Sequence, residues 1–189
     1  TPEEHTVRII DEALGAVDFD LSPDLVGLTA TTAVAPRAYE IADGFRAKGV
    51  PVVMGGMHAS ALPSEALQHV DAVVVGEAEG LWPQVLEDAA HGRLQPIYRH
   101  QTLPDPRLIP AARRDLLDVR RYCAGNTLQA SRGCPFACSF CTVSTFFGRS
   151  YRTRPVDEVI QEAASLDGGP LLFVDDNIVG DPSYAKELF

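Results

Sequence analysis

Three cysteines lie close together in the second half of the chain, in the segment Cys134-Pro-Phe-Ala-Cys138-Ser-Phe-Cys141. They follow a strand-like run at 126–131, and Gly133 stands directly before the first of them. Cysteine thiolates are the usual protein ligands of iron-sulfur clusters. A Cys-x3-Cys-x2-Cys loop can hold three irons of a 4Fe-4S cluster and leave the fourth iron without a protein ligand. The spacing therefore predicts a cluster with one iron open for chemistry.

The residues alone leave other roles open for these cysteines. Zinc prefers four tetrahedral ligands, and Cys123 could supply the fourth. However, zinc sites usually combine two ligand pairs, whereas these three cysteines share one loop. Disulfides are disfavoured because four cysteines in 189 residues form no distributed framework. Cys123 itself is expected to be a small buried side chain.

The cysteine segment resembles the signature of the radical S-adenosylmethionine superfamily, including the aromatic residue, Phe140, before the last cysteine. The resemblance implies that Cys134, Cys138 and Cys141 hold the 4Fe-4S cluster and that the open iron binds S-adenosylmethionine. An electron from the reduced cluster then cleaves the sulfonium to give methionine and a 5′-deoxyadenosyl radical. It also implies that Phe140 packs near the adenine; the alternative is a core aromatic.

An acidic segment, Asp175-Asp176-Asn177, follows a second apolar run. Most members of the superfamily have Gly-Gly-Glu here, which receives the methionine amino group, and the acidic variant is similar to that of the cobalamin subgroup. The resemblance implies that Asp175 or Asp176 accepts a hydrogen bond from the ammonium group of S-adenosylmethionine. A helix cap is the alternative role.

The elements that must position these residues form one strand-helix-strand unit. We expect a strand at 127–130, a helix at 156–166 and a second strand at 171–174. Parallel α/β sheets and barrels place ligand groups at the carboxyl ends of their strands, where the acidic segment stands. The arginines of the connecting loop are expected to form salt bridges on a solvated surface, with an anion clamp as the alternative, at Arg149, Arg152 and Arg154.

The first half alternates apolar β-branched runs with amphipathic stretches, which predicts a parallel sheet with crossover helices. We expect short buried strands at 7–10, 25–29, 50–54 and 72–75. Helices are expected at 36–48, 63–69 and 80–91. In the first of these, apolar residues recur at helical spacing and Gly49 is placed to end the helix.

The first half also resembles the cobalamin-binding fold. Thr29-Ala30-Thr31 follows one expected strand and Gly55-Gly56 follows the next, and in that family such segments make room for the nucleotide tail. The resemblance implies cobalamin contacts from seven residues: Thr29, Thr31, Gly55, Gly56, Met57, His58 and Glu77. An ordinary strand-helix turn and a locally hydrogen-bonded histidine are the alternatives. The chain contains no Asp-x-His-x-x-Gly motif, so coordination of cobalt by histidine is not implied.

Composition excludes some classes of function. A net charge of −10 disfavours a nucleic-acid-binding surface, and no run approaches the roughly 18 apolar residues of a membrane span. The first residues do not resemble a signal peptide, so we expect a cytoplasmic protein. The expected partners are a small-molecule substrate and an external electron donor such as flavodoxin or ferredoxin.

We therefore expect an α/β protein with a Rossmann-like, cobalamin-binding-type domain at 1–93 and a linker at 94–125. Residues 126–189 are expected to begin a radical S-adenosylmethionine partial TIM barrel. Both ends are expected to be incomplete, since a doubly wound sheet normally has an earlier strand and helix, and one strand-helix-strand unit cannot close a barrel.

The expected function is that of a cobalamin-dependent radical S-adenosylmethionine enzyme that methylates an unactivated carbon, although this fragment alone is expected to be inactive. A radical cyclase or ring-rearranging enzyme of the same architecture is the first alternative. A non-catalytic metal- or cofactor-binding module is the second. That module would need a saturated cluster, yet no fourth ligand lies within the cysteine loop.

Overall fold

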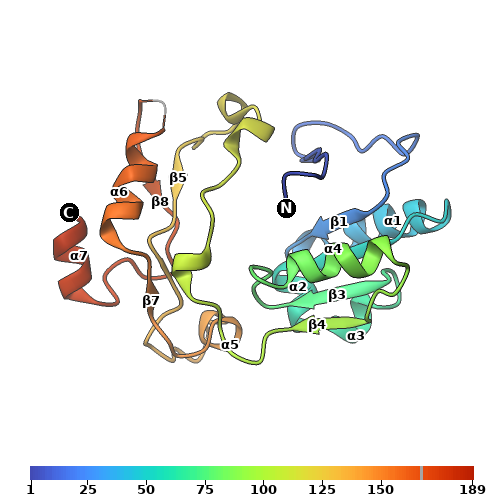
Figure 1. The fold of residues 1–189 in the computed structure, drawn as a ribbon. Helices are drawn as coiled ribbons and strands as arrows, with labels where there is room; N and C mark the ends of the chain where they lie inside the picture. Colours follow the sequence, from blue (N-terminus) through green and yellow to red (C-terminus); the bar gives the residue numbers. More distant parts are fainter. Residues whose placement is uncertain (167) are drawn as a thin grey trace. The chain divides into compact units, whose positions relative to one another are not determined.

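The structure is a computed structural model that describes residues 1–166 and 168–189. The chain forms two compact units, Thr1–Pro104 and Asp105–Phe189 (Figure 1). Across the described residues, no helix is both long and apolar enough to cross a membrane.

A four-stranded parallel sheet forms the centre of the first unit (Figure 1). Its strands are β1 (Val26–Thr29), β2 (Val52–Gly55), β3 (Ala72–Val75) and β4 (Ile97–Arg99), and they pair in chain order. Three of them lie within two residues of the strands expected from the sequence. Thr29 pairs in register with Gly55, so the two segments that resemble cobalamin ligands meet at one edge of the sheet.

Two features of this unit differ from the sequence expectation. The expected strand at 7–10 is wrong: these residues form no strand, and Val7 and Ile9 are 37% and 45% exposed. An apolar run becomes a strand only when a neighbouring strand pairs with it, and none does here among the described residues. Conversely, β4 lies within the stretch expected to be a linker, and its Tyr98 is buried against β3.

The helices of the first unit are α1 (Ala35–Arg46), α2 (Gly56–Ala61), α3 (Pro63–Ala66) and α4 (Trp82–Ala90), with a 3-10 turn η1 (Thr32–Val34) before α1. Proline occupies a first-turn position of α1, α3 and α4, where its missing N–H costs nothing. The helix α2 was not expected. It begins directly at the Gly55-Gly56 pair, so the turn after β2 is very short.

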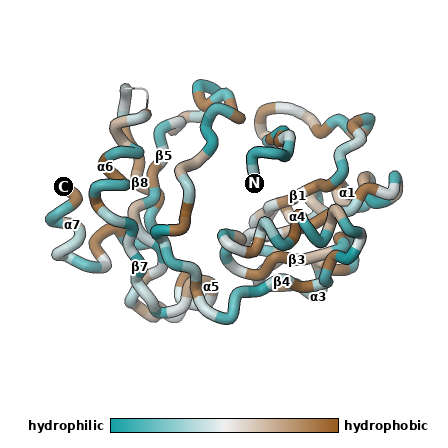
Figure 2. Tube along the Cα trace, viewed as in Figure 1, coloured by the Kyte–Doolittle hydropathy of each residue, from teal (hydrophilic) through white to brown (hydrophobic). Residues whose placement is uncertain are grey.

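Alternate residues of the strands point to opposite faces of the sheet, and each face is covered. Val52, Met54 and Val73 pack in one core with residues of α1, α2 and α3. Val53, Ala72 and Val74 pack in a second core with Val85 of α4 and Tyr98. Figure 2 shows hydrophobic residues along the strands of this unit, as expected for a parallel sheet buried on both sides.

The second unit contains the expected strand-helix-strand arrangement. Strands β5 (Thr127–Leu128) and β8 (Leu172–Phe173) pair in parallel, with α6 (Val156–Ala164) between them in sequence. A second, antiparallel pair joins β6 (Ser131–Arg132) to β7 (Arg152–Thr153). The remaining elements are short: η2 (Pro106–Leu108), η3 (Arg114–Leu116), η4 (Val119–Arg121), α5 (Val143–Phe146) and α7 (Pro182–Leu188).

A small apolar core stabilises the second unit. Leu128, Ala130 and Val159 are buried at its centre, and partly buried residues that include Phe173 and Tyr184 pack around them.

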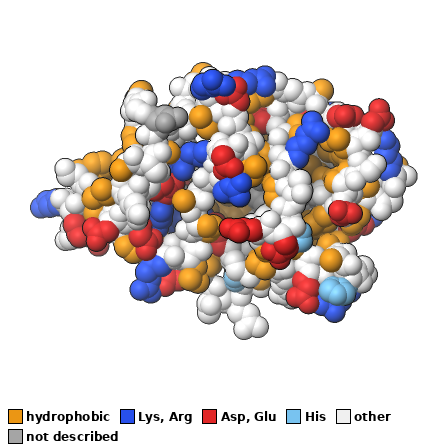
Figure 3. Space-filling model, turned by 45° about the horizontal axis from the view of Figure 1, so that its top comes forward, with side chains coloured by type: hydrophobic (Ala, Val, Ile, Leu, Met, Phe, Trp, Pro, Cys, Tyr) orange, Lys and Arg blue, Asp and Glu red, His pale blue; other side chains and the backbone are white. Residues whose placement is uncertain are grey.

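On the face of the molecule shown in Figure 3, acidic and basic side chains are interspersed, and no continuous basic surface is seen.

We predict that Met54→Ala lowers the free energy of unfolding by about 2–5 kcal/mol, because it leaves a cavity at a fully buried position of the central strand β2. Met57→Ala is the matched control, since Met57 is 37% exposed, and its cost should be below about 1 kcal/mol. Urea unfolding followed by circular dichroism measures both. Equal losses in the two variants would contradict the assignment of the core.

Candidate functional site

The first candidate site is the contact between the loop after β1 and the Gly55-Gly56 turn after β2. Gly56 has φ +84°, and a Cβ atom at this position would collide with Thr29 Oγ1 and lie 3.4 Å from the Ala30 nitrogen. The His58 backbone N–H donates a hydrogen bond to the Ala30 carbonyl at 3.2 Å. Glycine is therefore required here both for backbone conformation and for close approach.

His58, one of the residues implied to contact cobalamin, is 3% exposed. Its Nε2 lies 2.7 Å from the Tyr39 hydroxyl and 3.3 Å from Glu65 Oε1, and its Nδ1 lies 3.3 Å from Thr32 Oγ1. Both ring nitrogens thus have protein partners, which is the arrangement of a locally hydrogen-bonded histidine. Burial, with help from Glu65, raises the pKa of Tyr39 to about 12, so its hydroxyl stays protonated at neutral pH.

The other residues of this edge fall into an exposed and a buried group. Thr29 and Thr31 are exposed, as is Met57, whereas Glu77 is only 7% exposed. The Gly76 backbone N–H donates to Ser60 Oγ at 2.9 Å, which ties the loop after β3 to α2.

The sequence analysis did not identify the supporting residues Tyr39, Ser60 and Glu65. Only Tyr39 could have been noticed in the sequence, because its hydroxyl places a polar group on the apolar face of α1.

The second candidate site is the cysteine loop, whose two ends are joined by the β6–β7 pair. Ser131 pairs with Thr153 and Arg132 with Arg152, so residues 133–151 form a loop whose two ends are held together. Gly133 has φ +84°, and a Cβ atom there would collide with the Ser150 carbonyl. The tip is open to solvent: residues 135–140 are all exposed, and Phe140 is 88% exposed, so it is not a core aromatic.

All four cysteines are free thiols, and Cys138 is exposed while Cys134 and Cys141 are half-buried. The expectation that Cys123 is buried is wrong, since its side chain is exposed. In residues 1–166 and 168–189, no three His, Cys, Asp or Glu side chains are gathered closely enough to hold a metal ion. By their chemistry, the thiols of Cys134, Cys138 and Cys141 are nevertheless the donor type that an iron-sulfur cluster takes.

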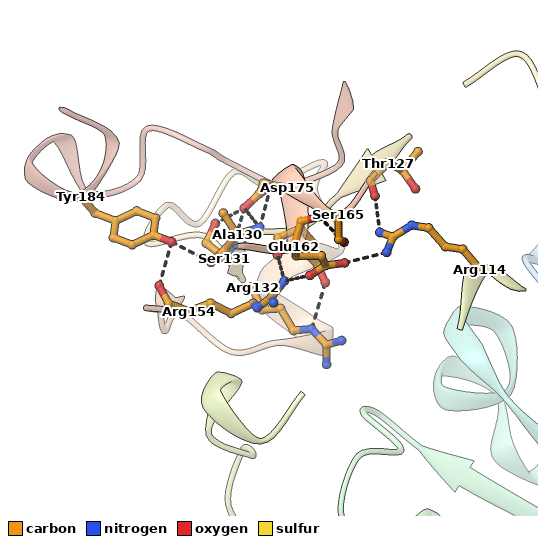
Figure 4. A network of polar contacts seen from close by, with 11 residues as sticks. Arg114, Thr127, Ala130, Ser131, Arg132, Arg154, Glu162, Ser165, Asp175 and Tyr184 are labelled. Atoms are coloured by element: carbon orange, nitrogen blue, oxygen red, sulfur yellow. Dashed lines mark hydrogen bonds and ion pairs between the residues drawn. The ribbon is translucent and has the colours of Figure 1, made fainter. Parts of the chain in front are cut away.

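The acidic segment after β8 contacts the start of the cysteine loop. The Asp175 carboxylate accepts hydrogen bonds from the backbone N–H of Ala130 at 3.1 Å and from both the N–H and the hydroxyl of Ser131 (Figure 4). Asp176 Oδ2 accepts from the Gly133 N–H at 3.1 Å. The side chains that resemble S-adenosylmethionine ligands thus lie against the cysteine loop.

An ion-pair network around the buried Glu162 joins α6 to the β5 segment and to the residue after β7 (Figure 4). Glu162 on α6 pairs with Arg114 at 2.8 Å and with Arg154 at 2.7 Å. Arg114 also donates to the Thr127 carbonyl at 2.7 Å and Arg154 to the Gln129 carbonyl at 3.0 Å.

This network corrects one expectation from the sequence. Arg154 forms a salt bridge as expected, but it is 8% exposed rather than on a solvated surface. The partner could not be identified from sequence because Glu162 is brought to Arg114 and Arg154 only by the tertiary fold.

The network gives a prediction about acid stability. Burial alone would raise the pKa of the Glu162 carboxyl, but hydrogen bonds and charges from Arg154 and Arg114 outweigh burial and hold this pKa below its usual value. Its contribution to stability is thus complete above a pH of about 4.5 and is lost as the pH falls through the lowered pKa. Glu162→Gln should lower the free energy of unfolding by about 3 kcal/mol at pH 7, and the difference from wild type should shrink below pH 4.5.

Denaturant unfolding between pH 7 and pH 3 measures this difference. Gln161→Leu, at an exposed position of the same helix, serves as the control and should show no comparable loss. A Glu162→Gln deficit that is the same at every pH would contradict the charge-based explanation.

A second prediction concerns the Gly56 contact. Gly56→Ala and Gly49→Ala both place a Cβ on a backbone with positive φ, which costs about 1–2 kcal/mol. Gly49 has open space around it, whereas Gly56 faces Thr29 and Ala30. We expect Gly56→Ala to lose at least about 1 kcal/mol more than Gly49→Ala in chemical denaturation. Equal losses would show that the close approach has no energetic weight.

Comparison with known proteins agrees with this geometry. The family model of the B12 binding domain matches residues 7–86. The bacteriochlorophyllide d C-8(2)-methyltransferase of Chlorobaculum tepidum is 39% identical over 164 residues, which are 82% of this chain and 36% of that protein. The bacteriochlorophyllide d C-12(1)-methyltransferase of the same organism is 34% identical over 194 residues, which are 96% of this chain and 42% of that protein. The chain thus spans less than half the length of these relatives.

A solved structure shows the same fold. The radical S-adenosylmethionine methyltransferase TsrM of Kitasatospora setae aligns over 89% of this chain and 40% of its own, with a TM-score of 0.65 and 20% identity. That protein was solved with cobalamin and a 4Fe-4S cluster bound, and also with tryptophan as substrate and a S-adenosylmethionine analogue. Residues 7–86 are therefore a B12-binding domain of the kind found in cobalamin-dependent radical S-adenosylmethionine methyltransferases.

Proposed function

We propose that the protein containing this chain is an enzyme that uses cobalamin, a 4Fe-4S cluster and S-adenosylmethionine to methylate an unactivated carbon. One observation carries the proposal: a B12-binding domain and a Cys-x3-Cys-x2-Cys loop on a parallel strand-helix-strand unit occur in one chain. The names of the relatives support the reaction type, since both C. tepidum proteins are methyltransferases acting at numbered carbons of a bacteriochlorophyllide.

The cluster would be held by Cys134, Cys138 and Cys141. Three thiols on one solvent-open loop, with no fourth ligand in that loop, leave one iron available to S-adenosylmethionine. The fully exposed ring of Phe140 is free to pack against the adenine. When bound, the cluster supplies the electron that cleaves S-adenosylmethionine, and cobalamin supplies the methyl group.

Cobalamin would bind at the carboxyl edge of the first sheet. The close approach of Gly56 to Thr29 and Ala30 keeps side chains out of this edge, as a nucleotide tail requires. Thr29, Thr31 and Met57 are exposed and available for contacts. His58 and Glu77 are buried, as is part of Gly55, and we propose that His58 supports the loop from within rather than reaching cobalt.

The remaining features follow from this proposal. The first unit, Thr1–Pro104, would bind cobalamin, and the second unit, Asp105–Phe189, would hold the cluster. The substrate would be a small molecule, and an external one-electron donor such as flavodoxin or ferredoxin would reduce the cluster.

We predict that the full-length protein, reconstituted anaerobically, binds about four irons per chain. Cys138→Ser should lose most of this iron because it removes one of three ligands. Cys123→Ser is the matched control, since Cys123 is also an exposed thiol but lies outside the loop, and it should bind iron as wild type does. Iron and zinc are quantified by elemental analysis, and 5′-deoxyadenosine formed from S-adenosylmethionine is measured by chromatography.

The same measurement separates the alternatives. Stoichiometric zinc in place of iron would contradict the proposal, as would iron binding that survives Cys138→Ser. Release of 5′-deoxyadenosine by a protein that binds no cobalamin would favour a radical enzyme without methyl transfer. A cluster that never cleaves S-adenosylmethionine would favour a binding module.

A further inference from the structure

Three consecutive residues after β8 contact the start of the cysteine loop in matching order. Asp175 accepts hydrogen bonds from Ala130 and Ser131, Asp176 accepts from Gly133, and Asn177 Nδ2 lies 3.5 Å from the Cys134 sulfur. The two segments thus run alongside each other from the ends of strands that belong to one unit. The last contact is between a neutral amide donor and a cysteine of the proposed cluster site.

The contacts of Asp175 give it a structural role. Its Oδ1 accepts from both the N–H and the hydroxyl of Ser131, and its Oδ2 accepts from the Ala130 N–H. A carboxylate with three donors from one loop is already satisfied, so it has little capacity left for the ammonium group of a ligand. Asp175 therefore fixes the backbone that leads into Gly133 and Cys134.

The side chain of Asn177 has a defined orientation. Its Oδ1 accepts a hydrogen bond from the Val179 backbone N–H at 3.2 Å, which only an oxygen can do. The amide nitrogen must then face the other way, toward Cys134 Sγ. The donor is directed at the sulfur by the backbone of its own turn, so it does not depend on a choice between two amide flips.

We propose that Asn177 is a positioning residue for Cys134. The side-chain N–H of Asn177 holds the Cys134 sulfur in place and raises the reduction potential of the bound cluster. This inference rests on the proposed function, because it takes Cys134 to be a cluster ligand. Hydrogen bonds to ligand sulfurs stabilise the more negative, reduced state of an iron-sulfur cluster, and such outer contacts also orient the ligands. Removing the donor should make the cluster harder to reduce.

The test compares reduction potentials of variants of the full-length protein. Asn177→Leu removes the amide without adding charge. Asn177→Asp keeps its size and its acceptor for Val179, but it removes the donor and adds a negative charge that also disfavours reduction. Gln161→Leu, which removes an exposed amide from α6, is the control. Each protein is reconstituted anaerobically, its iron content is measured, and its cluster is titrated while reduction is followed by electron paramagnetic resonance.

We expect Gln161→Leu to match wild type. At a fixed solution potential, the ratio of reduced to oxidised cluster should be roughly three- to tenfold lower in Asn177→Leu, and lower also in Asn177→Asp. Loss of iron from Asn177→Leu with a native circular dichroism spectrum would also support the positioning of Cys134. Unchanged iron content and unchanged potential in both Asn177 variants would overturn the inference. Failure of the wild-type protein to assemble a cluster would instead overturn the proposed function.

Discussion

The hydrogen bonds of the Asp175 carboxylate are the interaction on which the second unit depends. Strands β5 and β8 are only two residues long, so their backbone pairing alone would hold them weakly. Asp175 extends the contact beyond the strand ends by accepting from Ala130 and Ser131, at the point where the chain passes from β5 into β6. The position of the cysteine loop follows from this junction.

In each unit, two segments at the carboxyl ends of strands lie in close contact, but the contact is made in different ways. In the first, the turn after β2 reaches the loop after β1 by omitting a side chain, since a Cβ on Gly56 would collide with Thr29. In the second, the segment after β8 reaches β6 and the loop after it by means of polar side chains, which bind the backbone of Ser131 and Gly133 and the Cys134 sulfur. In both cases the residues at the carboxyl ends of strands define the candidate site, as is usual in parallel α/β folds.

Local sequence patterns were sufficient for the continuously apolar strands and for the helix with apolar residues at helical spacing. The apolar runs of β1, β2 and β3 and the helical spacing of Ala38, Ile41, Ala42 and Phe45 predicted their elements to within a few residues. The strand at 7–10 failed because an apolar run does not specify a pairing partner, and β4 was missed because prolines and charges surround its three residues.

The candidate sites could be predicted only in part. The cysteine spacing identified the loop, since the residue types that bind a cluster can be recognised from sequence alone. The ion-pair network of the same unit could not be predicted, because Arg114, Arg154 and Glu162 are brought together by the tertiary fold. The same is true of His58 and Tyr39, which are 19 residues apart and lie on different helices.

The central claim is that the cysteine loop holds a cluster whose open iron binds S-adenosylmethionine. The most direct measurement is the electron paramagnetic resonance spectrum of the reduced, reconstituted full-length protein, recorded with and without S-adenosylmethionine. We predict a 4Fe-4S signal whose line shape changes when S-adenosylmethionine is added. A cluster signal that is identical in the two spectra would contradict the claim.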